Sequence, residues 1–212
     1  MNFLTFKSTF QDYPVFSRTE IKKHFPNFDP KNLVRWQKKG YLLKVRNNWY
    51  CFEDHQWDER QLFWVANRIY TPSYISLEAA LSYYGLIPEG VFTMQSISTR
   101  KTNTFATPIG HFTYATVKPS WYFGYQMKES GRLYCAIAEP AKALLDLLYL
   151  RPELQTDDQF DALRLNMAEV HAVLDIPKYR HYLETLAGPA LQDRGRRLLA
   201  FIQRSGAYAV TR

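Results

Sequence analysis

The first 53 residues carry start and stop signals that allow few folds. Ser17 is a typical helix N-cap, and Glu20 follows at the spacing of a capping box, so a helix is predicted from residue 18 to about residue 24. Asp29 caps the next helix, with Pro30 at its first position, where a missing N–H costs nothing. Gly40 follows in the left-handed position that ends many helices. These signals predict two short helices in close succession.

Two further patterns complete the unit. Residues 2–12 form a predicted amphipathic helix, and its apolar stripe is Phe3, Leu4, Phe6 and Phe10. After Gly40, the segments YLLKVR and WYCFE are predicted strands, joined by the hairpin turn Asn47-Asn48. Three helices followed by a two-stranded wing predict a winged helix-turn-helix.

Charged and apolar side chains alternate along this unit because they serve two surfaces. Lys31, Arg35 and Lys38 are spaced i, i+4, i+7, so they share one face of the third helix, while Leu33 and Trp36 point inward. Pairing of the hairpin is expected to place Val45 opposite Tyr50 and Leu43 opposite Phe52 on the inner face, and Arg46 opposite Trp49 on the outer face. Arg46 is therefore expected at the exposed wing tip, steadied by a cation–π contact.

The charge distribution favours a polyanionic partner. Residues 1–53 contain 10 Lys/Arg and 4 Asp/Glu, a net charge of +6, whereas residues 54–212 contain 17 and 16, a net charge of +1. A cationic helix face supplies the electrostatic part of DNA binding. The expected DNA contacts are Lys31, Asn32, Arg35, Gln37, Lys38, Lys39, Lys44 and Arg46, of which Asn32, Arg35 and Gln37 could read base edges. The alternatives are a solvated face and a module that binds an acidic protein.

The rest of the chain is predicted to form a mixed structure. A capped helix starts near Asp58 without a Gly/Ser linker before it, so the boundary falls between residues 53 and 58 and the two parts should pack together. Residues 54–150 alternate predicted strands with helices, a mixed α/β core. Residues 151–212 form a helical extension packed on that core. The expected fold class is α+β. The basic loop at Arg100 and Lys101 is either a second nucleic-acid contact or an ordinary solvated loop.

Catalytic and metal-binding motifs are not found in the sequence. The five histidines are scattered, and no Gly-rich phosphate loop or zinc pattern occurs. Glu139 and Lys142 come close to an acid-x-Lys nuclease pattern but lie one residue too far apart, and a helix start is the simpler explanation. We expect a protein without cofactor or metal and without enzymatic activity, with a metal-dependent nuclease as the alternative. The two distant cysteines, the absence of a signal-peptide pattern and the lack of a long apolar run predict a cytoplasmic protein.

Four segments in order resemble the AbiEi-type antitoxins of abortive-infection, type IV toxin–antitoxin systems. They are FSRTEIKKHFPNFDPKNLVRWQKKGYLLKVRNNWYCF, SYISLEAALSYYGLIPE, SISTRKT and IAEPAKALLDLLYL. The resemblance implies a bacterial repressor-antitoxin whose winged helix represses its own operon. The remainder of such a protein counteracts a nucleotidyltransferase-like toxin, without a stable complex between the two. It implies double-stranded operator DNA as the partner. Separately from the resemblance, the geometry of DNA favours a dimer where the operator is symmetric. A regulator or interaction module without a toxin partner is the other reading of the same segments.

Overall fold

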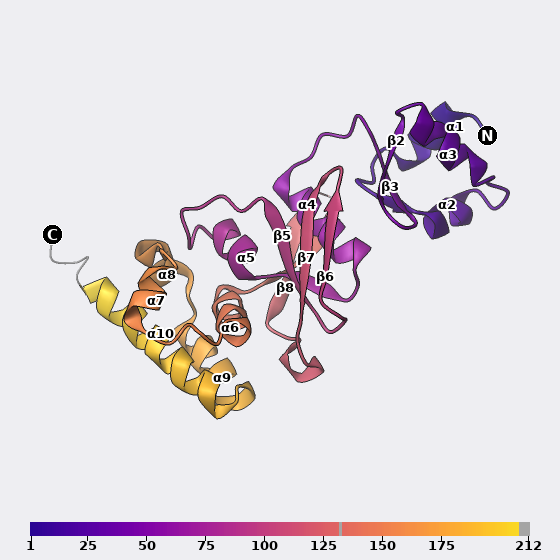
Figure 1. The fold of residues 1–212 in the computed structure, drawn as a ribbon. Coiled ribbons are helices and arrows are strands. Elements are labelled where there is room, and N and C mark those ends of the chain that lie inside the picture. The colour runs from indigo at the N-terminus through magenta and orange to yellow at the C-terminus, as the bar shows by residue number, and fades with distance from the viewer. Residues whose placement is uncertain (132, 208–212) are drawn as a thin grey trace.

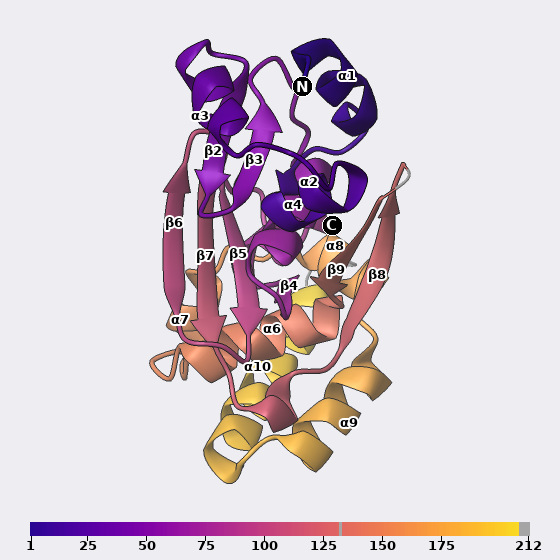
Figure 2. The ribbon, with the colours of Figure 1, turned by 90° about the vertical axis from the view of Figure 1, so that its right-hand side faces the viewer.

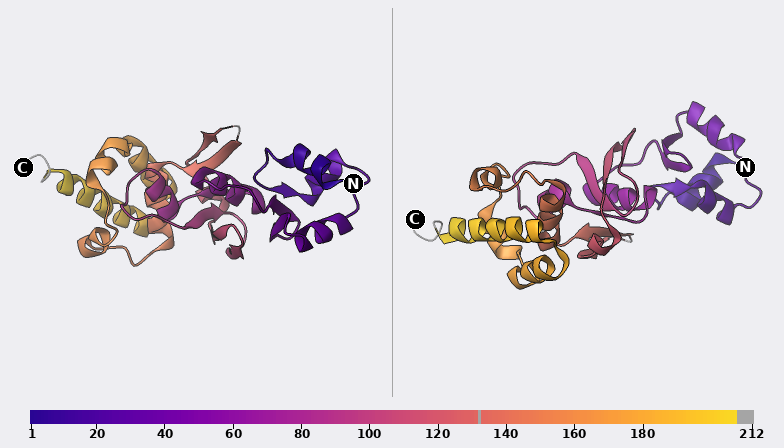
Figure 3. Two further views of the ribbon diagram at one scale, coloured as in Figure 1. Left: turned by 90° about the horizontal axis from the view of Figure 1, so that it is seen from above. Right: turned by 60° about the horizontal axis from the view of Figure 1, so that its bottom comes forward.

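The computed structural model describes residues 1–131 and 133–207. With 47% helix and 21% strand, the protein is α+β, as the sequence predicts. Figure 1 shows a winged helix at one end, a sheet in the middle and helices at the other end. The two views in Figure 3 show the same order. The helical extension predicted for residues 151–212 is described as far as Ala207, and residues 208–212 lie outside the described residues.

The N-terminal unit has the three helices and the two wing strands in the predicted order, together with a short strand, β1 (Phe16–Ser17), that was not predicted. These are α1 (Phe3–Phe10), β1 (Phe16–Ser17), α2 (Arg18–His24), α3 (Lys31–Lys38), β2 (Leu42–Arg46) and β3 (Trp49–Phe52). The strands form a small sheet in the order β1-β3-β2. The capping box is present: the Ser17 side chain accepts from the Glu20 N–H, and the Glu20 side chain accepts from the Ser17 N–H. Gly40 has the left-handed backbone (φ +69°) that ends α3.

Aromatic rings fill the core of the winged helix. Phe6, Phe10 and Phe16 are almost fully buried, as are Trp36 and Phe52. The ring centroids of Phe6 and Trp36 lie 4.7 Å apart. Leu4, which the helical period placed in the same stripe, is 71% exposed, so that part of the prediction is wrong.

The hairpin register differs from the predicted one because β2 contains a bulge. Arg46 pairs with Trp49 as expected, but the register shifts between Lys44 and Arg46, so Lys44 pairs with Tyr50. A bulge adds one residue to its strand and changes which face the following side chains occupy. Leu42, rather than Leu43, therefore joins the aromatic core, and Val45 is buried on the other side of the hairpin.

The middle of the molecule is a six-stranded mixed sheet. Its elements are α4 (Glu59–Ile69), β4 (Ser73–Ile75), α5 (Leu77–Tyr83), β5 (Thr93–Ser98), β6 (Asn103–Thr107), β7 (Gly110–Thr116), the short 3₁₀ turn η1 (Pro119–Trp121), β8 (Tyr125–Ser130), β9 (Leu133–Ala138) and α6 (Pro140–Leu150). The strand order is β6-β7-β5-β4-β9-β8. Two neighbouring pairs, β5 with β7 and β4 with β9, are parallel, so the sheet is not purely antiparallel as expected.

Helices cover both faces of this sheet. The Tyr114 hydroxyl donates to the carbonyl of Ala66 in α4, and the Tyr74 hydroxyl donates to Asp146 in α6. The strand register puts Tyr74 and Tyr114 on opposite faces of the sheet. Tyr74 pairs with Ile97 of β5 and Tyr114 pairs with the preceding residue, Ser96, and successive side chains of a strand point to opposite faces. Figure 2 shows the same arrangement, with α4 on the near side of the sheet and α6 behind it.

The C-terminal helices pack on α6. They are α7 (Asp157–Asp161), α8 (Met167–Val173), α9 (Ile176–Leu186) and α10 (Pro189–Ala207). The longest, α10, packs against the other three and α6. A Cβ atom at Gly195 would lie 2.4 Å from the Leu183 side chain, so only glycine allows α10 to approach α9 this closely. One hydrophobic core runs from the sheet into these helices.

The winged helix is docked on the sheet through its hairpin. Val45 and Cys51, on the back of the hairpin, belong to the main hydrophobic core rather than to the aromatic core. Ion pairs join Lys7 to Asp54 at 2.5 Å and Glu20 of α2 to Arg68 of α4. The two parts therefore pack together, as the lack of a flexible linker predicts.

A buried polar cluster lies between the sheet and α6. Lys142 and Asp146 are both fully buried and form an ion pair. Asp146 also accepts hydrogen bonds from Ser76 (2.7 Å), Trp121 (2.8 Å) and Tyr74 (3.0 Å). The rings of Trp121 and Phe123 lie 4.5 and 4.7 Å from the Lys142 ammonium. Burial lowers the pKa of Lys142, and the adjacent Asp146 carboxylate opposes that shift.

Candidate nucleic-acid interface

Helix α3 presents a cationic face to solvent and packs its opposite face on the aromatic core. The Asp29 carboxylate accepts from the Lys31 N–H at 2.9 Å and so fixes the start of the helix. Leu33 and Trp36 are buried in the aromatic core. Lys31, Arg35, Lys38 and Lys39 are exposed, and the exposed Val34 lies among them. The predicted cations of α3 are therefore all on the surface.

Two of the three predicted base-reading residues are already engaged within the helix. Asn32 is only 8% exposed, and its side-chain oxygen accepts from the Arg35 guanidinium at 2.7 Å. Gln37 is half-buried and donates to the Leu33 carbonyl at 2.9 Å. Exposure of Asn32 was expected from its place beside the cationic face, and that expectation is wrong. Asn32 instead orients Arg35, which is the exposed base-edge candidate.

Arg46 of the wing is half-buried rather than at an exposed tip. Its guanidinium donates to the carbonyl of Ile69 and lies over the Phe105 ring, 4.2 Å from the centroid. Burial lowers the pKa of Arg46. The predicted cation–π contact with Trp49 is made by Arg68 instead, at 5.5 Å. The predicted exposure of Arg46 is thus wrong: its pairing with Trp49 is the predicted one, but the central sheet covers this side of the hairpin. Lys44, on the same strand, is exposed.

A second group of cations lies beside the wing tip, on α2. Arg18, Thr19, Lys22 and Lys23 line an open depression of about 420 Å³ together with Asn48 of the wing turn. The Arg18 N–H donates to the Asn48 carbonyl at 2.9 Å, which joins the start of α2 to the wing. None of these residues was among the predicted contacts. The Lys22-Lys23 pair next to a helix-turn-helix was the sequence signal that could have identified them.

The predicted second basic contact lies next to the wing. Arg100 and Lys101 are exposed in the loop between β5 and β6. The Arg100 guanidinium lies 4.5 Å from the Tyr70 ring centroid, and that of Arg46 lies 5.4 Å from the same ring. The Tyr70 hydroxyl donates to the Lys101 carbonyl at 2.6 Å. The structure therefore brings the loop and the wing together at Tyr70.

The two residues of the nuclease alternative belong to different environments. Glu139 is paired with Lys178 of α9 at 3.1 Å and accepts from the Tyr182 hydroxyl at 3.2 Å. Lys142 is fully buried against Asp146. The fold therefore does not bring Glu139 and Lys142 into one accessible site. Among residues 1–131 and 133–207, no three His, Cys, Asp or Glu side chains gather in a set that could hold a metal ion.

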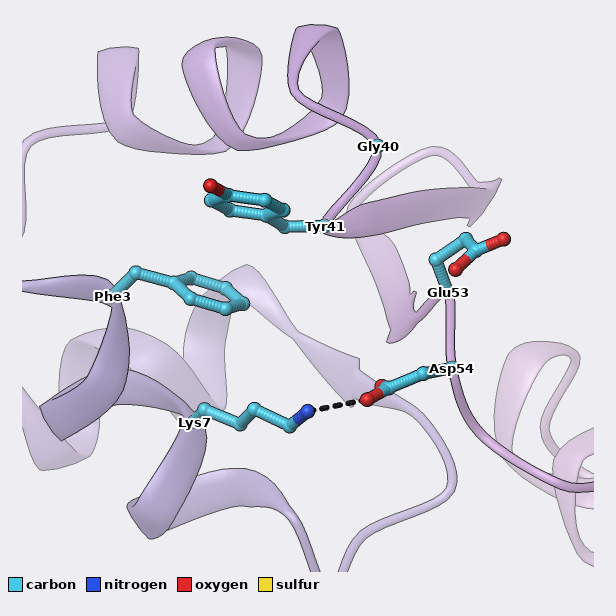
Figure 4. Close-up of a pocket in the computed structure, with 6 residues that line it drawn as sticks. All are labelled: Phe3, Lys7, Gly40, Tyr41, Glu53 and Asp54. Carbon is cyan, nitrogen blue, oxygen red and sulfur yellow. Dashed lines mark hydrogen bonds and ion pairs between the residues drawn. The ribbon is translucent and has the colours of Figure 1, made fainter.

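A small cavity of about 250 Å³ lies where the chain leaves the winged helix (Figure 4). The rings of Phe3 and Tyr41 lie 4.6 Å apart on one side, and the Lys7–Asp54 ion pair closes the other side. Glu53 also lines it. Two carboxylates make this cavity unsuitable for phosphate, so we do not include it in the nucleic-acid interface.

No protein-family model matches the chain, and a comparison with curated proteins gives no match. In the described part of the chain, no helix has both the length and the apolar character that crossing a bilayer requires.

Proposed function

We propose that this protein binds double-stranded DNA through α3 and regulates transcription. The observation that carries the proposal is the arrangement of α3, whose cations face solvent while Leu33 and Trp36 anchor it in a separate aromatic core. A helix held in this way in a winged helix can enter the major groove, and its cations can replace counterions on the phosphates. Arg35, oriented by Asn32, is the residue that we assign to base reading.

The α2 cations extend this surface toward the wing tip. Arg18, Lys22 and Lys23 are aligned beside Asn48, at the edge where α2 meets the hairpin. We assign them to phosphate contacts flanking the helix insertion. Arg46 is not part of the proposed interface, because its guanidinium donates to the Ile69 carbonyl and stacks on the Phe105 ring. The role of Arg100 and Lys101 as a further contact is also part of the proposal.

The resemblance to AbiEi-type antitoxins supports a more specific role. In that role the protein represses its own operon as a cytoplasmic antitoxin, and the part that follows the winged helix counteracts a nucleotidyltransferase-like toxin. Both cysteines are buried free thiols, which suits a reducing compartment. Coexpression with any nucleotidyltransferase gene found next to its own would test this role: growth should be restored by the full chain. Continued growth arrest would contradict the antitoxin part alone.

DNA binding is tested by a salt titration. Binding to a duplex from upstream of the gene is measured by fluorescence anisotropy for the unchanged protein and for Lys31→Ala with Lys38→Ala, which removes two exposed α3 lysines that we assign to phosphate. The plot of log K against log salt has a negative slope, and each lost phosphate contact makes it shallower by about 0.9, so the double variant should have a slope about 1.8 smaller in magnitude. Arg180→Ala with Arg196→Ala is the matched control, since it removes two exposed cations from α9 and α10 at the other end of the molecule. Equal slopes in all three proteins would exclude α3 from the interface.

A further inference from the structure

Strand β8 is an open edge of the central sheet. It is the last strand in the order, and within residues 1–131 and 133–207 no strand pairs with its outer side. The opposite edge strand, β6, has the wing beside it, where Arg46 covers Phe105. Figure 2 shows β8 standing at the side of the sheet, away from the wing. An unpaired edge is a template for another strand.

Two features that protect many edge strands, a bulge and a proline, are missing from β8, although Lys128 and Glu129 place one charge of each sign on it. Its pairing with β9 runs without a bulge from Tyr125 to Ser130, and it contains no proline. Its exposed side is also apolar: Tyr125 is 38% exposed and Met127 57%, and the neighbouring Tyr134 on β9 is 55% exposed. Exposed apolar side chains that flank an unpaired edge are typical of a surface that binds another chain.

The hydrogen bonds to β9 determine which backbone groups of β8 are free. The Glu139 N–H donates to the Gly124 carbonyl at 2.9 Å, so residue 124 points its backbone groups toward β9. Direction alternates along an antiparallel pair. The N–H and C=O groups of Tyr125, Met127 and Glu129 therefore point outward, to the free side.

We propose that β8 pairs with β8 of a second copy of this chain, antiparallel, about a twofold axis at Met127. In this register Met127 faces Met127 of the second copy, and Tyr125 faces Glu129 in both directions. All three residues have outward backbone groups, so about six backbone hydrogen bonds form, two for each facing pair.

Side-chain chemistry selects the same register. The Tyr125 phenol would meet the Glu129 carboxylate, the two Met127 side chains would meet at the axis, and on the other face Gln126 would meet Lys128. No like charges face each other. A shift of the axis to residue 128 would place Lys128 opposite Lys128 and lose one hydrogen-bonded pair, so this register is disfavoured.

The interface is small, so the dimer should be weak. Stable complexes bury about 800 Å² on each partner, and a single short strand pair buries less than that. We therefore expect association in the micromolar range or weaker, visible as a concentration dependence. The inference does not depend on DNA binding, although such a dimer would suit an operator with two symmetric half-sites.

The test uses complementary charges at the proposed axis. Sedimentation velocity of the full chain over a wide concentration range should show a monomer–dimer equilibrium. Met127→Lys and Met127→Glu should each be monomeric, because like charges would face each other at the axis. An equimolar mixture of the two variants should associate at least as well as the unchanged protein. Met127→Leu, which keeps an apolar side chain, is the control and should still dimerise.

Each outcome decides the proposal. A monomer at all concentrations overturns it, and so does dimerisation of either charged variant alone, which would place the contact elsewhere. Failure of the mixture to associate excludes an axis at Met127. Circular dichroism of each variant establishes that the fold is retained, which is expected because Met127 is exposed. Met127→Cys gives a second measurement: oxidation should yield a disulfide-linked dimer, since the native cysteines Cys51 and Cys135 are buried.

Discussion

Replacement of Lys142 by methionine should destabilise the protein strongly. The substitution keeps most of the side-chain volume but removes the charge that pairs with the fully buried Asp146. Removing one partner of a buried ion pair costs about 3–5 kcal/mol, because the charge of the other partner stays buried without an opposite charge or water to compensate it. For a chain of this size each kcal/mol corresponds to about 2–4 °C, so the midpoint of thermal unfolding should fall by roughly 6–20 °C.

The matched control is Lys178→Met. Lys178 also pairs with a carboxylate, Glu139, but its side chain is 40% exposed. A partly exposed pair contributes about 0–1 kcal/mol, so the same substitution should have little effect there. Urea unfolding followed by tryptophan fluorescence gives the free energy of unfolding of both variants and of the unchanged protein.

A double variant separates loss of charge balance from loss of packing. In Lys142→Met with Asp146→Asn both charges are gone, and the amide can still bond to its neighbours, because Tyr74 and Ser76 hydroxyls donate and accept. The double variant should be more stable than the sum of the single changes predicts, by about 2 kcal/mol or more. Additive effects, or a cost below about 1 kcal/mol for Lys142→Met, would refute the reasoning.

Two other predictions concern the hairpin. Arg46→Ala should lower the free energy of unfolding by about 1–3 kcal/mol, since it removes the hydrogen bond to the Ile69 carbonyl. It should leave the salt slope of DNA binding unchanged, whereas Lys44→Ala on the same strand should make that slope shallower by about 0.9. A shallower slope for Arg46→Ala would mean that the arginine contacts phosphate. Burial raises the pKa of the Cys51 thiol to about 12, above the value of about 8.5 in an unfolded chain. The Cys51 thiol therefore stays protonated to a higher pH in the folded state than in the unfolded state. The stability that this thiol contributes is present below about pH 8.5 and is lost as the pH rises toward 12, by about 1.4 kcal/mol per pH unit. Cys51→Ala should show a shallower loss in urea unfolding between about pH 9 and 11, and an unchanged loss would contradict the assignment.

The helices were largely predictable because their signals are local. Ser17, Asp58 and Thr156 each cap a helix and form a capping box with the residue three positions later. Such a signal needs only a few neighbouring residues. Strands β1, β4 and β8 were missed: β1 has two residues and β4 three, and YQMKES in β8 lacks the β-branched pattern of a typical strand.

The candidate site was predictable only in part, because two of its features depend on side-chain contacts that helix and strand periodicity do not show. Whether Arg46 faces solvent depends on the sheet that covers this side of the hairpin. Whether Asn32 is accessible depends on its contact with Arg35 as much as on its helical position. Helical spacing does correctly predict the exposed cations of α3, since Leu33 and Trp36 leave only one way to orient that helix.

The docking of the hairpin has a geometric consequence for any complex on DNA. Because Val45 and Cys51 are packed into the core of the larger part, the winged helix has no freedom to swivel on a tether. A duplex bound along α3 would thus set the direction of the whole molecule. The terminal helices, at the far end of an elongated body, would then be held at a constant distance from the bound DNA.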